Sequence, residues 1–200
     1  MLRKSLFAMV AVVLFSAAFA APARAQSQAV SFSIGYLTLR GEDARLAEGD
    51  ILASELNAGY IDALVFNLKD FNQATVGGEW LIGIGRFLEG SLGIGYYTSR
   101  GVPSVSANYV NENGSEIMQT LRLRIVPITA TVRLLPLGRS GVVEPYFGAG
   151  VGIFNWRYSE VGQFVASDES IYTADYIATG TNAGPVVLGG LRVPFGKYAI

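Results

Sequence analysis

The sequence contains no cysteine and no histidine, and these two absences exclude several kinds of protein. Without cysteine no disulfide framework can form, and without either residue there is no Cys/His zinc site and no histidine-based catalytic triad. The "GAGVG" at residues 148–152 lacks the G-x-G-x-x-G spacing, and no helix pattern follows it, so it does not indicate a nucleotide site. We therefore expect no cofactor, no bound metal and no enzymatic activity.

Long apolar runs are also missing after the first 25 residues. Arg3 and Lys4 precede an apolar segment at residues 6–20, and "ARAQ" at residues 23–26 supplies an A-x-A cleavage site before Gln26. We predict that residues 1–25 are a secretory signal peptide, with an earlier cut after Ala20 as the alternative. Residues 26–200 then form one exported domain, and no later stretch is long enough for a membrane helix.

Positive charge is scarce in the exported part of the chain. The predicted leader removes three of the 15 basic residues and none of the 16 acidic ones, which leaves a net charge of about −4. This balance gives no basic footprint for nucleic acid, which is therefore not an expected partner. Lys69 and Lys197 are the only lysines after the leader, so the polar faces described below would coat a water-exposed surface poorly.

What the sequence does contain is alternation of apolar and polar residues, which is typical of β-strands with two different faces. The predicted strands are residues 30–40, 74–84, 89–99, 118–137, 142–157 and 184–193, with a seventh beginning at Lys197 and the second extending back toward Asp62. The connections alternate strictly between long and short: residues 41–62, 100–117 and 158–183 are long, and residues 85–88, 135–141 and 194–197 are short. This pattern predicts an all-β, antiparallel, up-and-down barrel with one plain rim and one elaborated rim, as in transmembrane barrels.

The stretch from Met118 to Leu137 changes phase at Pro127. Before the proline, leucine and isoleucine occupy the odd positions; after it, apolar residues occupy the even positions. Because proline cannot donate to a strand ladder, we predict one long strand with a β-bulge at Pro127, and two shorter strands with a break as the alternative.

The polar faces of these strands carry glycine, serine and threonine with a few charges, which suits the filling of a narrow lumen. We expect the apolar faces to meet lipid, and Gly148, Gly150 and Gly152 to make room inside the barrel. The charged candidates for the lumen are Glu79, Glu89, Arg122, Arg124, Arg133, Glu144 and Arg192. They would form either an ion path or, as we favour for about eight strands, a salt-bridged plug.

The exported leader, "PYFGAGVG" at residues 145–152 and "VGGEWLIGIG" at residues 76–85 resemble the small outer-membrane β-barrel families of Gram-negative bacteria, of the OmpA, OmpX and OmpW types. The resemblance covers residues 30–200 and is closest to barrel domains without an assigned function. It implies an outer-membrane location, an even number of strands, insertion by the barrel-assembly machinery, and both termini in the periplasm.

Such barrels end on a strand whose last residue is aromatic, whereas this sequence stops at "FGKYAI" with Ile200. An odd number of strands would leave open edges, which lipid does not tolerate. We therefore expect the C-terminal strand or strands to be missing from this sequence. The alternative is a different topology, in which residues 62–68 pair separately.

Three functions remain open. The first is a non-enzymatic outer-membrane barrel, either structural or a narrow passage for small or apolar solutes. The alternatives are an outer-membrane barrel enzyme acting on lipid and a soluble exported lipocalin-like barrel, in which the apolar faces would line a ligand cavity. The expected partners are outer-membrane lipid and lipopolysaccharide, together with a surface ligand held by the long loops at residues 41–50 and 164–176.

Overall fold

The computed structural model describes residues 28–45, 63–139, 142–195 and 198–199. The predicted signal peptide and most of the predicted connection at residues 41–62 lie outside the described residues. Within the described residues, no helix is long and apolar enough to cross a membrane.

Nine strands form one antiparallel sheet, which confirms the all-β prediction, and a two-stranded hairpin lies apart from it. The strands of the sheet are β1 (Gln28–Leu37), β2 (Ala44–Arg45), β3 (Leu64–Phe66), β4 (Gln73–Ile84), β5 (Leu88–Thr98), β6 (Val102–Val110), β7 (Glu116–Leu134), β8 (Glu144–Val165) and β9 (Ile171–Arg192). The hairpin consists of β10 (Pro194–Phe195) and β11 (Tyr198–Ala199), where the sequence predicted the start of a seventh long strand.

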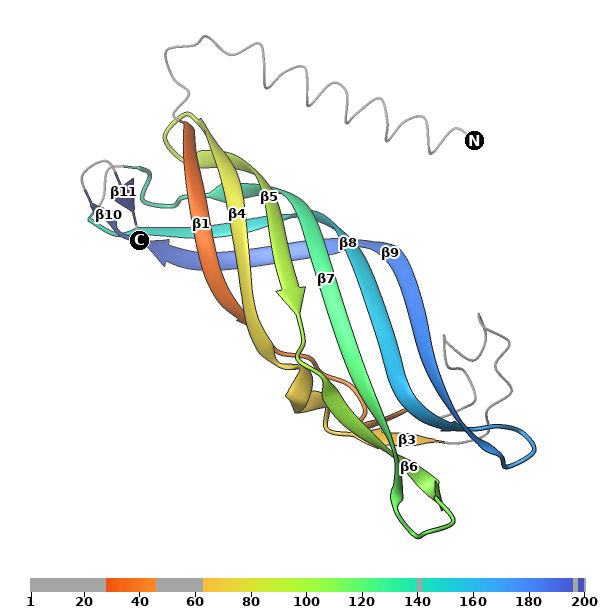
Figure 1. The fold of residues 1–200 in the computed structure, drawn as a ribbon. Helices are drawn as coiled ribbons and strands as arrows, with labels where there is room; N and C mark the ends of the chain where they lie inside the picture. Colours follow the sequence, from red (N-terminus) through yellow and green to blue (C-terminus); the bar gives the residue numbers. More distant parts are fainter. Residues whose placement is uncertain (1–27, 46–62, 140–141, 196–197, 200) are drawn as a thin grey trace, which may run out of the picture.

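The sheet is a meander in which the first three long strands are each broken once. β5 and β6 pair with successive parts of β7. On their other side, β5 pairs with β4 and β6 pairs with β3. β1 and β2 complete the series beside β4 and β3, while β7, β8 and β9 run without a break (Figure 1). Residues 64–66 thus pair as a separate strand, which was the alternative topology considered from the sequence.

A short 3-10 helix, η1 (Leu68–Phe71), causes the break between β3 and β4. The side chain of Asn67 accepts a hydrogen bond from the backbone N–H of Lys69 and so caps the helix, which is the usual role of asparagine at this position. The turn buries Phe71, which packs edge-to-face on Phe66 with ring centroids 5.9 Å apart.

Two of the three predicted long loops are strands. Residues 102–110 and 116–121 form a hairpin around a turn at residues 111–115, and β8 and β9 continue to a tight turn at residues 166–170. The loop prediction for residues 100–117 and 158–183 is therefore wrong. These segments are rich in polar residues because one face of each strand is exposed, and not because they lack regular structure.

The predicted β-bulge at Pro127 is also wrong, whereas the prediction of one long strand is confirmed. The register of β7 with β8 is continuous from Gln119 to Leu134, and Pro127 lies opposite Phe154. On the β5 side the ladder skips the positions around Pro127 and resumes with the same register. Gly95 accommodates the proline ring, since a Cβ at Gly95 would lie 2.8 Å from Cγ of Pro127.

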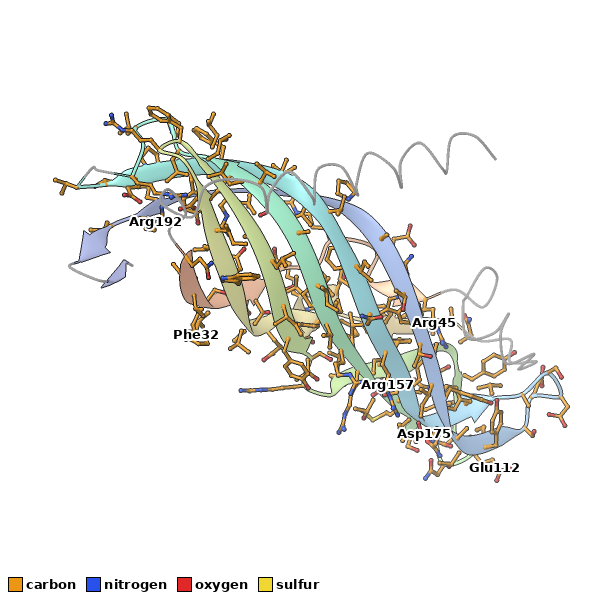
Figure 2. The ribbon with its side chains drawn as sticks, turned by 90° about the horizontal axis from the view of Figure 1, so that it is seen from above. Phe32, Arg45, Glu112, Arg157, Asp175 and Arg192 are labelled. Atoms are coloured by element: carbon orange, nitrogen blue, oxygen red, sulfur yellow. The ribbon has the colours of Figure 1, made fainter. Side chains whose placement is uncertain are left out.

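The sheet is strongly twisted and curved (Figures 1 and 2), and side chains from non-adjacent strands meet on only one of its described faces. Arg192 of β9 reaches Glu89 of β5 across two intervening strands, so this face is concave. We call it the inner face and the opposite one the outer face.

The polarity of the two faces is exchanged partway along the strands. Toward the short turns, the outer face carries exposed apolar side chains in every long strand; Phe147 and Val151 are 60% and 64% exposed. We call this the outer apolar band, and the part of the sheet that carries it the band half. Its members include Val30, Phe32, Ile34, Val76, Trp80, Ile84, Leu88, Leu92, Ile94, Ile128, Val132, Leu134, Phe147, Val151, Ile153, Val187 and Leu191.

Beyond one row of paired residues the outer face becomes polar. Ile94, Ile128 and Ile153 lie side by side in that row. Arg124 and Arg157 form the second outward-facing pair beyond it, four residues farther along each strand. The inner face changes in the opposite sense, from mainly polar to more apolar. We call the part beyond the row the distal half. The phase change at Pro127 in the sequence is this exchange.

Candidate functional site: the inner face of the sheet

The inner face of the band half holds a set of ion pairs. Arg192 donates to Glu89 at 2.9 Å and lies 2.6 Å from Glu144, while Arg139 reaches Glu89 at 3.2 Å. All four side chains are largely buried, and three of them come from different strands. Figure 2 shows Arg192 at the end of the sheet opposite to Arg45 and Arg157. Because each charge faces an opposite one, this network joins β5, β8 and β9 at the end with the short turns.

A second inner pair lies toward the middle of the band half. Arg133 of β7 contacts both carboxylate oxygens of Glu79 of β4, and it lies over the ring of Tyr146 at 5.0 Å. Ser91 donates to Glu79 at 3.2 Å and shares a 2.6 Å hydrogen bond with Thr131. The ion pair therefore reaches across β5, where the hydroxyls of Ser91 and Thr131 add hydrogen bonds. These contacts stabilise the curvature of this part of the sheet.

Glycines leave the space that these long side chains fill. A Cβ at Gly148 would lie 3.0 Å from Cγ of Arg133, and one at Gly83 would collide with the guanidinium of Arg139. Gly148, Gly150 and Gly152 lie on the inner face. Gly148 and Gly150 are bordered by the adjacent strands, whereas Gly152 lies against Phe154 of its own strand and Val186 of β9.

The inner face of the distal half is more apolar, although it also buries polar side chains such as Ser104 and Gln119. Its buried cluster consists of Leu64, Phe71, Val102 and Leu121. Beside it lies an open cavity of about 390 Å³, lined mainly by apolar atoms. The residues around it are Leu39, Ala44, Arg45, Phe66, Leu68, Phe71, Leu123, Trp156, Tyr158 and Ala178.

One buried ion pair borders this cavity. Arg45 of β2 contacts Glu160 of β8, which is 0% exposed, and Tyr158 donates to the other carboxylate oxygen of Glu160 at 2.8 Å. The pair fastens the short strand β2 across the cavity to β8. The lining thus has a polar edge formed by Arg45 and Tyr158.

Of the seven charged residues selected from the sequence, the structure brings five onto the inner face of the band half. These are Glu79, Glu89, Arg133, Glu144 and Arg192. The structure places Arg122 and Arg124 on the outer face of the distal half, exposed and apart from the other five. Arg122 and Arg124 are even-numbered, like the outward residues Ile128 and Val132. Because β7 has no bulge, its even-numbered residues face outward along the whole strand.

Three charged residues of the inner face were not selected from the sequence. Arg139 lies in a predicted short turn, and Arg45 and Glu160 lie in predicted long loops. Glu160 could have been found, because it continues the inward phase of Trp156 and Tyr158 beyond the predicted end of the strand. Arg45 and Arg139 offered no comparable signal.

The turn between β8 and β9 lies in one of the two predicted surface-ligand loops; of the other, residues 41–45 are described and end in β2. The hydroxyl and then the backbone N–H of Ser170 donate to Asp168, and these bonds hold the pKa of that exposed carboxyl below its usual value. Next to the turn, burial and then a 2.7 Å hydrogen bond with Tyr176 raise the pKa of Tyr172. In the part of the chain that the structure describes, no three acidic side chains are placed to hold a metal ion.

Comparison with known proteins gives no relative from which a role could be transferred. No protein-family model, no curated protein and no solved structure matches the chain.

Proposed function

We propose that this protein is a non-enzymatic outer-membrane β-barrel protein of a Gram-negative bacterium, which holds a small apolar solute in its distal half. The observation that carries the proposal is the outer apolar band. Water-exposed surfaces rarely carry contiguous apolar patches of more than a few hundred Å². Here exposed side chains such as Ile94, at 58%, and Val151 recur on every long strand of the band half.

The height of the band supports a membrane-spanning role. On β8 the outward residues are apolar from Pro145 to Ile153, and Asn155 is the next outward residue. At about 3.3 Å per residue these nine positions measure roughly 26 Å along the strand. A tilted membrane strand needs about 9–11 residues. The inner face over the same length carries paired charges and hydroxyls, as the interior of a small membrane barrel does.

A spanning sheet must leave no free edge, because unpaired backbone groups are costly in lipid. β1 and β9 each pair with only one strand of the described sheet. We propose that β1 and β9 are the edges across which the sheet closes into a barrel.

The apolar cavity supports binding of an apolar solute. Its volume of about 390 Å³ falls within the range of small-molecule sites, and a few polar atoms of Arg45 and Tyr158 at its edge could orient a ligand. The paired charges of the band half fill the inner face beneath it. They favour a solute bound from the distal end over one that crosses the whole barrel.

Two tryptophans permit a direct test, because the chain contains only Trp80 in the outer apolar band and Trp156 at the cavity. In vesicles of lipid brominated on the acyl chains, we expect Trp156→Phe, which retains Trp80, to lose more than half of its fluorescence. Trp80→Phe, which retains Trp156, should lose little. Equal quenching of the two variants, or a protein that stays in solution without detergent, would refute the membrane assignment.

The same Trp80→Phe variant tests the solute site. Adding 1-naphthol as an apolar probe should quench Trp156 saturably by energy transfer, and Ala178→Trp in a Trp80→Phe/Trp156→Phe background should lower the affinity for the probe at least tenfold by filling the cavity. Linear, non-saturating quenching that the Ala178 substitution does not change would overturn the solute proposal and leave the membrane assignment intact.

A further inference from the structure

Two arginines face each other on the outer face just beyond the apolar band. Arg124 of β7 and Arg157 of β8 are directly paired in the ladder, and both side chains are exposed. Like charges directly opposite each other in an antiparallel pair destabilise a sheet. Arg122 adds a third guanidinium on the same face of β7, two residues farther from the band.

Within the described residues no carboxylate offsets this charge. Neither Arg124 nor Arg157 forms an ion pair with a described residue, although five other ion-pair contacts occur among the described residues. The outward acid of β9 in this region is Asp175, four residues from the position opposite Arg157, which is roughly 13 Å along the strand.

The two arginines border a shallow hollow of about 270 Å³ on the sheet surface. Its other outward residues are Val126, Asn155, Thr179 and Thr181. The Thr181 hydroxyl donates to Oδ1 of Asn155 at 2.8 Å. With that oxygen occupied, Asn155 offers its Nδ2 hydrogens as donors beside the two guanidiniums. The hollow is therefore lined by donors and positive charge, a set that suits a phosphate group.

The position of the hollow identifies the source of the phosphate. Asn155 and Val126 lie in the row next to Ile128 and Ile153, where the outer apolar band ends. A phosphate bound there would have its attached acyl chains against the band. We propose that Arg124 and Arg157, with Asn155, bind the phosphate group of a membrane lipid in the leaflet next to the distal half. This inference rests on the proposed membrane location.

Native mass spectrometry of the detergent-solubilised full chain can measure this binding. Phosphatidic acid, which carries a phosphate monoester, should be retained at least tenfold more strongly than diacylglycerol with the same acyl chains. Inorganic phosphate at the same concentration should not compete, since it lacks the chains. Arg124→Gln/Arg157→Gln should abolish the preference for phosphatidic acid, whereas Arg124→Lys/Arg157→Lys should keep most of it. As a control, Arg86→Gln removes an exposed arginine near the short turns and should leave the preference unchanged.

A stability measurement separates binding from a purely structural role. Without phosphate lipid, the double glutamine variant should unfold at a higher temperature than the unaltered protein, because it lacks the opposed charges. Added phosphatidic acid should raise the unfolding temperature of the unaltered protein only. Equal retention of both lipids, or an equal rise in the variant, would overturn the phosphate site. If Trp80 is nevertheless quenched by brominated lipid, the membrane assignment stands; if it is not, that assignment fails as well.

Discussion

Replacing Gly150 with alanine is the sharpest test of how the inner face is built. Gly150 lies on β8 opposite Thr131 of β7. A Cβ at this position would lie 2.6 Å from Cα of Thr131 and 2.9 Å from the carbonyl carbon of Ala130, and nearer still to the carbonyl oxygen. These are backbone atoms of a central strand, so no rotamer change can relieve the overlap.

The expected cost follows from the displacement. Carbon atoms in contact prefer about 3.5 Å or more, so β7 and β8 must separate locally by about 1 Å. That separation would stretch the adjacent ladder hydrogen bonds from about 2.9 Å to beyond bonding distance. Two such bonds at about 1 kcal/mol each give a loss of about 2 kcal/mol in the free energy of unfolding. This value lies within the range of about 1–3 kcal/mol found for overpacked interiors.

Gly90 supplies the matched control on the outer face. A Cβ there would have its nearest neighbour, Cδ1 of Ile84, at 4.0 Å. Gly90→Ala should therefore be neutral or stabilising by up to about 1 kcal/mol, through the lower entropy of the unfolded chain. Urea unfolding in one detergent, followed by strand circular dichroism, compares the two variants. Equal stabilities of Gly150→Ala and Gly90→Ala would refute the close approach of β7 and β8 at this glycine.

Two further predictions concern charged groups. Glu79→Gln leaves the buried Arg133 guanidinium without its carboxylate and should cost about 3 kcal/mol in the same urea assay. Glu79→Gln/Arg133→Met should recover part of that loss, and fully additive losses would contradict the pairing. The hydrogen bonds from Ser170 lower the pKa of Asp168 from its ordinary value of 3.8. They therefore stabilise the turn fully at a pH above 3.8, and this stabilisation is lost as the pH falls through the lowered pKa. Ser170→Ala should shift the Asp168 carboxyl midpoint, followed by carbon NMR, back toward 3.8; an unchanged midpoint would contradict this cause.

The sequence was sufficient to predict the all-β class, the antiparallel meander and the five charges on the inner face of the band half. Alternation with a period of two is a local property, and it identifies which residues share a face of a strand. Glu79 and Arg133 could thus be assigned to one face, although their pairing could not be derived. That contact spans β5 and depends on the curvature of the sheet.

The errors at Pro127 and beyond it have one physical cause. When the alternation of apolar and polar residues changes phase within one strand, there are two possible causes. Either an extra residue is inserted as a bulge, or the surroundings of the two faces are exchanged. The pairing of β7 with β8 distinguishes the two, because Ile128 lies beside Ile153, and Arg124 beside Arg157. Both strands change character at the same row, which an inserted residue in one of them would not produce.

Because of the exchange of polarity, the inner face is filled by ion pairs in the band half and contains an apolar cavity in the distal half. In the band half, the described inward charges are three acids and three arginines, each in an ion pair: Glu79, Glu89, Glu144, Arg133, Arg139 and Arg192. An ion moving past this set would meet no net charge and would have to break contacts between buried groups, which is costly. The distal half needs no such filling, because its apolar cluster stabilises it from within while its outer face is polar. In the barrel that we propose, a cavity can therefore exist there without opening a path for ions across the band.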